Sequence, residues 1–235
     1  KYFEGNKGYF SVAAFYKDLK SYIYNVGSDF DFSDFLAQTT FPPNFFPPGI
    51  QPQRVGTFTR PVNGDGGSLK GAEVAVSVPS EMFFENVRGF GVILSYSYTD
   101  SDIEIVDPPG NGFLVGNNLG RISLPGLSKN VWNATAYYEN AGFSARVAMR
   151  SRSDYIGELP NFANERAFKF VDGDRITDAQ LGYAFQGGAF EGLSVLLQVN
   201  NLTNEPYVAY ARNELRVQDV QDYGRQYLIG INYRL

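Results

Sequence analysis

The sequence predicts an all-β protein whose antiparallel strands build a transmembrane β-barrel. Three observations predict it: side chains alternate between apolar and polar with a period of two, short and long connections alternate along the chain, and aromatic residues are abundant while charges are scarce. Aromatic residues make up 16% of the 235 residues, and charged residues 19%. Strands with one apolar and one polar face suit a sheet that separates lipid from water.

The composition excludes several classes of protein. No apolar run approaches the roughly 18 residues that a membrane-spanning helix requires. The chain has no Cys, which excludes disulfides and thiol nucleophiles, and no His, the commonest metal ligand and general base. The net charge of -5 argues against nucleic acid as a partner. We therefore expect no cofactor, no metal site, no catalytic residue and no enzyme activity.

The expected strands show the period of two directly. In the last strand Tyr227, Ile229 and Ile231 share one face, and only Leu228 interrupts the polar face. Helical periodicity is not sustained anywhere in the sequence. The pattern predicts about nine strands, at residues 8–17, 20–27, 68–78, 89–99, 128–139, 143–152, 174–185, 193–200 and 226–235.

The connections alternate in length, which indicates which end of each strand lies outside the cell. The short ones fall near residues 18–20, 79–88, 139–142 and 186–188, and the long ones at 28–66, 101–126, 154–172 and 203–222. Outer-membrane barrels have short periplasmic turns and long extracellular loops, whereas soluble sandwiches mix connection lengths at both ends. Aromatic residues also gather near strand ends, as expected for belts at the two membrane interfaces: Tyr96, Tyr98, Tyr137, Tyr138, Tyr183, Phe185, Tyr227 and Tyr233.

The polar faces supply the residues that would line the lumen of the barrel. Arg146, Arg150 and Arg152 form a basic ladder on one strand, which either pairs with lumen carboxylates such as Glu73 and Asp178 or contacts an anionic substrate. We take Arg146 and Arg150 as candidate substrate-binding residues. The other residues expected on this face are Ser77, Ser95, Ser97, Asn133, Thr135, Gln180, Gln198, Asn200, Gln226, Asn232 and Arg234.

The first long loop, at 28–66, is rich in Pro and Phe. Its aromatic side chains predict either a small core that folds the loop on itself or a lid that contacts a ligand. Sugar sites combine aromatic faces with carboxylates, so Asp31, Phe45 and Phe46 are further candidates for substrate binding. The three Asp residues at 29, 31 and 34 lack the ligand spacing of a calcium loop.

Several motifs resemble those of TonB-dependent outer-membrane receptors. The run Val199-Asn200-Asn201-Leu202-Thr203-Asn204-Glu205-Pro206-Tyr207 is similar to the NLTN-x-x-Y hairpin of that family. It is followed by Gly224-Arg225-Gln226-Tyr227 and by a terminal strand at 228–235, as in those receptors. Two upstream pieces are similar to further strands of the same barrels: residues 14–18 together with Tyr22-Ile23, and residues 70–73. The resemblance spans residues 1–235 and differs from the family at the last residue, which is Leu235 where Phe is usual.

The resemblance implies a fold and a function. The fold is a 22-stranded barrel that is filled by an N-terminal plug and surrounded by outer-membrane lipid. The function is receptor-mediated import of a small substrate, an oligosaccharide or a ferric siderophore, driven by the TonB complex through the plug. The loop at 28–66 is most similar to the subfamily that takes up carbohydrate. The plug is then a further partner for the basic ladder.

The strand count predicts where the chain lies in such a barrel. If the C-terminus lies on the periplasmic side, counting back nine strands makes the first one descend from the outside. We therefore expect residues 1–235 to be the C-terminal portion of the barrel, without the plug and the first strands, in the outer membrane of a Gram-negative bacterium. The alternatives are a passive porin-type channel and a surface all-β module for binding or adhesion.

Overall fold

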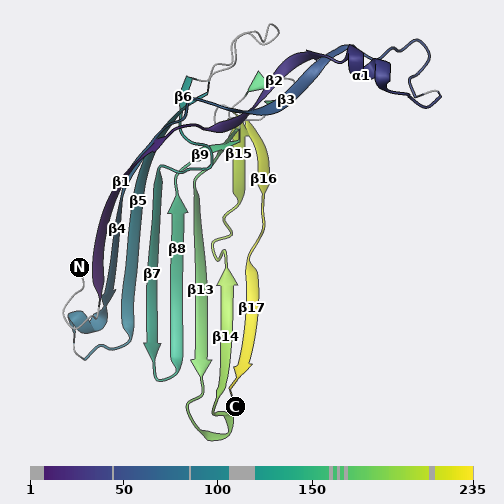
Figure 1. Cartoon of the computed structure of the whole chain (residues 1–235). Helices are drawn as coiled ribbons and strands as arrows, with labels where there is room; N and C mark the ends of the chain where they lie inside the picture. Colours follow the sequence, from purple (N-terminus) through teal and green to yellow (C-terminus); the bar gives the residue numbers. More distant parts are fainter. Residues whose placement is uncertain are drawn as a thin grey trace.

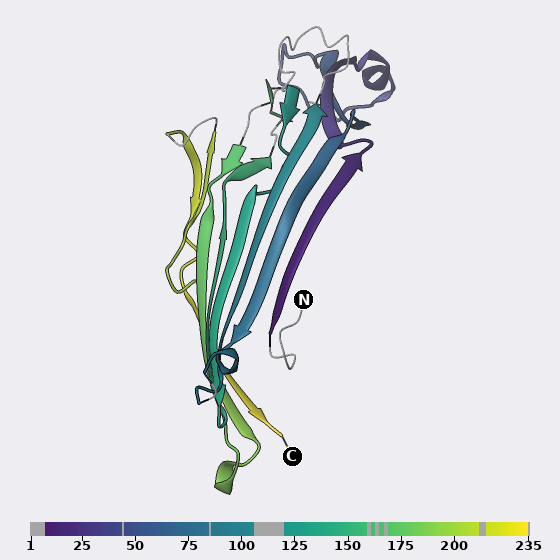
Figure 2. The same ribbon diagram turned by 90° about the vertical axis from the view of Figure 1, so that its left-hand side faces the viewer.

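A computed structural model describes residues 8–43, 45–84, 86–105, 120–158, 161–162, 165–166, 169–211 and 215–234. Its main sheet is one long antiparallel layer (Figures 1 and 2). In spatial order the long strands are β1 (Tyr9–Leu19), β4 (Gly67–Pro79), β5 (Phe90–Ile105), β7 (Asn130–Asn140), β8 (Phe143–Arg152), β13 (Asp174–Ala184), β14 (Leu193–Asn200) and β17 (Gln226–Tyr233). In the described part of the chain no helix is long and apolar enough to cross a membrane.

The strand register separates the side chains into a polar face and an apolar face. Paired residues in neighbouring strands share a face, and one row across the sheet runs through Ser97, Val131, Arg152 and Asp174. All residues that the sequence placed on the polar side have this same phase. The opposite face exposes large apolar side chains, among them Val92, Leu94, Val147, Leu181, Leu197, Ile229 and Ile231. So wide an exposed apolar surface marks a sheet that contacts something other than water.

Aromatic side chains form two belts on the apolar face. The lower belt includes Phe90, Tyr138 and Phe143, whose successive ring centroids are 4.4 and 6.0 Å apart. The upper belt includes Tyr96 and Tyr98, and the Tyr96 hydroxyl donates to Asn130 Oδ1 at 2.7 Å. Phe90 and Tyr98 are eight residues apart on β5, or about 26 Å along the strand. This spacing matches the apolar band of an outer-membrane barrel, which is about 25 Å tall.

Tyr137 is an exception to the expected belts, because it lies on the polar face opposite Gly91. Its ring occupies the space beside that glycine, where an added Cβ would overlap the Tyr137 ring.

The two-residue turn that follows β7 is Ala141-Gly142, with φ values of 49° and 81°. Positive φ at both positions is the geometry of a tight antiparallel hairpin. At this end of the sheet the other connections contain the short 3₁₀ helices η2 (Ser80–Met82) and η3 (Gly188–Phe190).

The long connections lie at the other end and contain strands of their own. A four-stranded sheet is formed there by β16 (Val217–Gln221), β15 (Tyr207–Ala211), β12 (Lys169–Val171) and β9 (Tyr155–Glu158), and β6 (Gly120–Ile122) extends the main sheet beside β5. A short pair is formed by β10 (Asn161–Phe162) and β11 (Glu165–Arg166). The buried apolar cluster of Ile103, Ile105, Ile122 and Ile156 also lies at this end. A sheet that is apolar on its outside has no core in its middle, so burial concentrates where the chain leaves the sheet.

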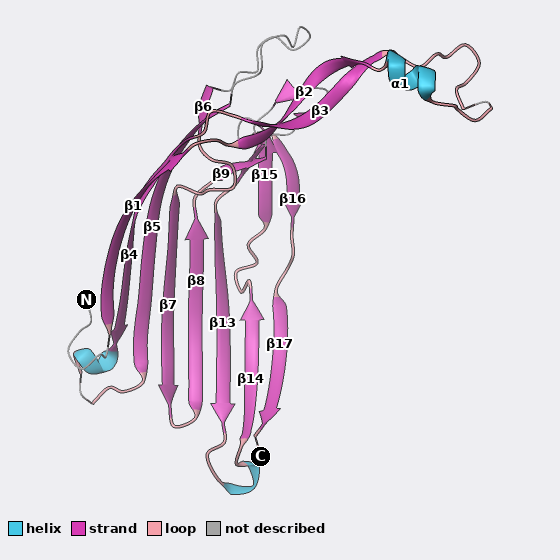
Figure 3. Ribbon diagram, viewed as in Figure 1, coloured by secondary structure: helices cyan, strands magenta, loops and turns pink. Residues whose placement is uncertain are grey.

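The first long loop forms an arm, which we define as residues 23–63. It consists of β2 (Ile23–Asp31), helix α1 (Ser33–Gln38) and β3 (Val55–Asn63), and it extends away from the upper end of the sheet (Figures 1 and 3). The helix has only six residues, too few for a helical period to show in the sequence. Rings pack within the arm: Phe30 lies 4.9 Å from Phe32 and 5.5 Å from Phe58 between ring centroids.

The strand expected at 20–27 does not belong to the main sheet, so the expected strand order needs a correction. The main sheet has nine strands in the described part of the chain, as the sequence predicts, but the ninth is β6. Residues 23–31 pair instead with 55–63, and β1 continues through Asp18 and Leu19, where a turn was expected. The prediction that the first strand descends from the long-loop end is therefore wrong, because β1 rises toward that end. Leu235 lies outside the described residues.

Candidate functional site

A pocket lies on the polar face where the main sheet meets the upper four-stranded sheet. We call it the seam pocket; it has a volume of about 310 Å³. The two strands that cross this seam are both interrupted: six residues, 201–206, lie opposite four residues, 222–225, between the pairs Asn200–Gln226 and Tyr207–Gln221. Such an irregularity bends both strands and opens a hollow between them.

Asn201 holds the two interrupted strands together. Its side-chain amide donates to the carbonyl oxygens of Glu205 at 3.1 Å and Gly224 at 3.2 Å, and its Oδ1 accepts the Glu205 N–H at 2.8 Å. The Asn201 backbone N–H donates to Asp178 Oδ1 at 2.9 Å, which ties the turn to β13. With φ of 53° the backbone of Asn201 is left-handed, a conformation that Asn tolerates better than most residues. Asn201, the first residue of the NLTN-x-x-Y motif, thus holds the pocket wall in place.

An ion pair lies on the floor of the pocket. Arg152 Nε and Nη2 both lie 2.8 Å from Asp174 Oδ2, and the Asp174 side chain is only 14% exposed. The Arg152 guanidinium also lies over the Tyr155 ring, 4.7 Å from its centroid. Asp174 Oδ1 is buried and has no hydrogen-bond partner in the described structure. A buried carboxylate oxygen normally accepts a hydrogen bond. Asp174 lines the pocket, so this oxygen is an unused acceptor on a residue of the pocket floor.

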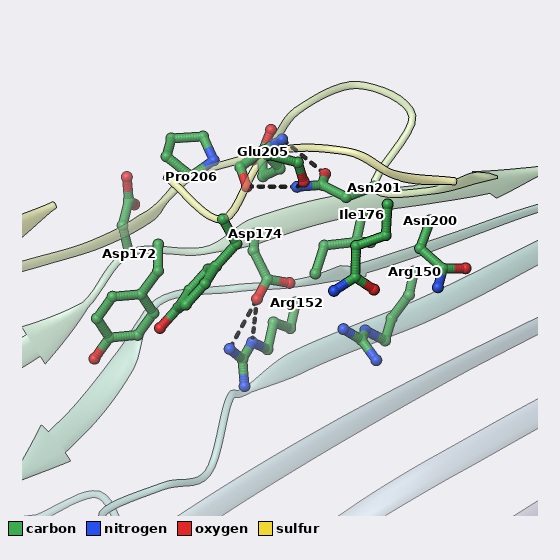
Figure 4. Close-up of a pocket in the computed structure, with 13 residues that line it drawn as sticks. Arg150, Arg152, Asp172, Asp174, Ile176, Asn200, Asn201, Glu205 and Pro206 are labelled. Atoms are coloured by element: carbon green, nitrogen blue, oxygen red, sulfur yellow. Dashed lines mark hydrogen bonds and ion pairs between the residues drawn. The ribbon is translucent and has the colours of Figure 1, made fainter. Parts of the chain in front are cut away.

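Arg150 also lines the seam pocket, two residues before Arg152 on the same face of β8. It forms no ion pair with any residue that the structure describes. Figure 4 shows Arg150 and Asn200 at one end of the pocket, and Asp172 and Pro206 toward the other. The Asp172 carboxylate accepts the Gly173 N–H at 2.9 Å. The pocket therefore has a cationic end and an anionic end.

The structure separates the five sequence-predicted site residues. Arg150 lies in the seam pocket, whereas Arg146 lies lower on the same face, in a second hollow beside Asp178 and Gln198. Phe45 and Phe46 lie in the arm and pack with Phe41, at ring-centroid distances of 5.3 and 4.9 Å from it. These rings belong to the loop's own packing, although Phe45 remains well exposed.

Asp31 has a structural role at the end of β2. Its Oδ1 accepts the Ser33 backbone N–H at 2.8 Å, at the start of helix α1. Hydrogen bonds from the Ser33 side chain and backbone hold the pKa of Asp31 below its usual range. In the described residues no group of three or more His, Cys, Asp or Glu side chains could hold a metal ion.

Sequence reasoning found the basic ladder and the pairing of one of its members, Arg152, with a lumen carboxylate, but the two carboxylates it named as examples are not the partner. The partner of Arg152 is Asp174, not Glu73 or Asp178; Asp178 instead accepts a backbone hydrogen bond from the turn. Asp174 has the same phase on β13 as Asp178, so the alternation alone could have included it. Tyr207 and Tyr223 also line the pocket but were not among the candidates. Tyr207 belongs to the NLTN-x-x-Y run, and Tyr223 directly follows the long connection at 203–222.

The comparison with known families identifies what kind of sheet this is. A family model described as "TonB dependent receptor-like, beta-barrel" matches residues 1–202. This chain belongs to the TonB-dependent receptor family. No curated protein and no solved structure matches it. In such a receptor barrel the apolar face of the wall contacts lipid and the polar face lines the lumen. The seam pocket of this family member therefore lies on the lumen face.

Membership also defines the broad function. The receptors of this family are transport proteins of the Gram-negative outer membrane, and the family is not a family of enzymes. The match ends at Leu202, so the NLTN-x-x-Y run extends past it and the terminal strand lies beyond it. The resemblance in the last part of the chain thus rests on the motifs themselves.

Proposed function

We propose that this chain is the C-terminal portion of an outer-membrane receptor barrel that binds a scarce substrate at the cell surface and imports it actively. In this proposal an N-terminal plug and the first strands complete the protein, and the TonB complex acts through the plug. The substrate is a small oligosaccharide or a ferric siderophore. The barrel lies in the outer membrane of a Gram-negative bacterium, with its apolar face in lipid.

The observation that carries this proposal is the place of the seam pocket. It lies on the lumen face and at the long-loop end of the sheet, where a substrate from outside first meets the barrel wall. Polar and aromatic side chains converge there, which is typical of ligand pockets. The proposal assigns substrate contact to Arg150, and it extends to Phe45 and Phe46 at the end of the arm, whose rings could stack against a sugar.

Arg146 suits a different partner. It lies on the lumen wall below the pocket, in a hollow with Gln180 and Gln198, and forms no ion pair within the described residues. A plug that fills the lumen would cover this row. We therefore assign Arg146 to contact with the plug.

Uptake measurements test the proposal. The full-length receptor is produced in the outer membrane of a Gram-negative host, and uptake of labelled oligosaccharides and ferric chelates is measured with and without the TonB gene. We expect saturable uptake that disappears without TonB and in the presence of a protonophore. Uptake that persists under both conditions, with solute flux through the purified protein in liposomes, would establish a passive channel instead.

A further inference from the structure

We propose that the seam pocket binds a hydroxy acid, with the ligand's carboxylate on Arg150 and a ligand hydroxyl donating to Asp174 Oδ1. The inference names the substrate chemistry of the pocket and rests on the proposed function. A uronic acid unit of an oligosaccharide carries this chemistry, with one carboxylate and free hydroxyl groups on the same ring.

The hydroxyl is assigned from the unused acceptor on Asp174. Arg152 donates twice to Oδ2 and leaves Oδ1 buried without a partner in the described structure. A carboxylate oxygen can only accept, so a ligand that fills this position must present a donor. A hydroxyl group supplies one and, unlike a second carboxylate, brings no negative charge next to Asp174.

The carboxylate is assigned from Arg150. Its planar guanidinium has five N–H donors, and no described carboxylate forms an ion pair with it. Among the described residues that line the pocket, the other cation is Arg152, which is already paired with Asp174 and stacked on Tyr155. A ligand carboxylate therefore finds its fork-shaped partner at Arg150, where two parallel hydrogen bonds are possible.

The remaining walls suit a hydroxylated carbon skeleton. The side-chain amides of Asn200 and Gln226 lie on paired residues at the Arg150 end, and each amide can both donate to and accept from hydroxyl groups. Tyr207, Tyr223 and Pro206 provide apolar surface toward the other side. The volume of about 310 Å³ is at the small end for ligand pockets, so we assign one hydroxy-acid unit to it.

The anionic end of the pocket restricts how many carboxylates the bound hydroxy-acid unit can carry. Asp172 and Glu205 both line the pocket, and Glu205 Oε1 accepts the backbone N–H of Arg175 at 3.2 Å. Figure 4 shows Asp172 far from Arg150 across the pocket. A second carboxylate at that end would meet these charges, so each bound unit presents a single carboxylate, at Arg150, and hydroxyl donors elsewhere.

Calorimetric titration of the purified full-length receptor in detergent tests the inference without energy coupling. The probes are trigalacturonate, its methyl ester, ferric citrate and a zwitterionic dipeptide. We expect trigalacturonate to bind. The neutral ester, which lacks the carboxylate, and ferric citrate, whose hydroxyl is a ligand of the iron, should bind far more weakly.

Variants connect the binding to the two assigned atoms. Arg150→Gln should weaken the affinity for the acid that binds by roughly 10- to 100-fold, while Arg234→Gln, on the same face at the short-turn end, should leave it unchanged. Asp174→Asn should weaken binding of the hydroxy acid but not of a matched acid that lacks the hydroxyl. Resistance of each folded variant to unfolding in sodium dodecyl sulfate confirms that it is intact.

The inference is overturned if trigalacturonate does not bind, if the methyl ester binds as well as the acid, if only ferric citrate or only the dipeptide binds, or if Arg150→Gln has no effect. Transport is a separate outcome. Acid binding together with TonB-independent uptake would overturn the proposed function and leave the ligand assignment standing. TonB-dependent uptake of a substrate that does not bind through Arg150 would support the proposed function and overturn the ligand assignment.

Discussion

Arg152 donates two hydrogen bonds to a single oxygen of Asp174, with Nε and Nη2 both 2.8 Å from Oδ2. The pair joins the upper ends of β8 and β13 in a row where the two residues are direct cross-strand neighbours. Because the Asp174 side chain is 14% exposed and that of Arg152 32%, water screens the two charges less than it does at the surface. This ion pair is therefore a structural element of the sheet as well as the floor of the pocket.

Removing the cation should cost stability because it leaves Asp174 without its partner. We expect Arg152→Met to lower the free energy of unfolding by about 1–3 kcal/mol, as measured by chemical denaturation of the full-length receptor in detergent. The matched control is Arg121→Met, which breaks the exposed pair with Asp102 at 2.6 Å and should cost at most about 1 kcal/mol. Equal losses in the two variants would contradict a special role for the pair on the pocket floor.

The side-chain amide of Asn201 should contribute more to the stability of the receptor than the left-handed backbone conformation of this residue. Asn201→Gly keeps the left-handed backbone accessible and removes only the side chain that bonds Glu205 and Gly224. We expect a loss of about 1–3 kcal/mol in the free energy of unfolding. Asn204→Gly is the control, since that residue is also left-handed, with φ of 59°, and its side chain makes one exposed hydrogen bond at 3.3 Å to Asp222.

If Asn204→Gly destabilises as much as Asn201→Gly, the clamp across the seam is not the source of the effect. Hydrogen exchange gives a second measurement. In Asn201→Gly the amides of β15 and β16 should exchange faster, because the amide that joins residues 205 and 224 is lost.

Adjacent residues on β8 test which face contacts lipid. Val147 lies on the apolar face, whereas Ala148 lies on the polar face opposite Asp178. Val147→Arg places a cation in the apolar band and should destabilise the barrel by about 2–4 kcal/mol. Ala148→Arg places the same side chain in the lumen next to a carboxylate and should be tolerated. Folding into lipid vesicles measures both, and the opposite order would reverse the assignment of the faces.

A substitution in the turn between β7 and β8 should raise the free energy of unfolding. Ala141 has a positive φ of 49°, which disfavours Ala. Ala141→Asn creates the Asn-Gly pair that two-residue hairpins prefer, and we expect about 0.5–1 kcal/mol of stabilisation. Gly142→Ala should destabilise instead, because its Cβ would overlap the Ala184 carbonyl oxygen. Thermal unfolding of the two variants in detergent should shift in opposite directions; a shift of both in one direction would contradict the turn geometry.

Much of the sheet could be predicted from the sequence because a strand's side chains alternate with a fixed period. The strands expected at 143–152 and 193–200 coincide with β8 and β14. The phase of each strand also assigned Arg150 to the lumen face and Ile229 to the opposite, apolar face. The strand at 20–27 was assigned to the sheet for the same reason, and that assignment was wrong, because alternation does not reveal which partner a strand pairs with.

The sequence by itself determined the fold class, the face on which the alternating polar and apolar side chains of the long strands lie, and the end of the sheet that carries the long connections. Only the tertiary structure decided that residues 23–31 pair with 55–63 in an arm, and that Arg152 meets Asp174 and not Asp178. Both carboxylates have the same phase on β13, and four residues separate them. The choice depends on the register between two strands, which the hydrogen bonds along their whole length set together and which no local pattern contains.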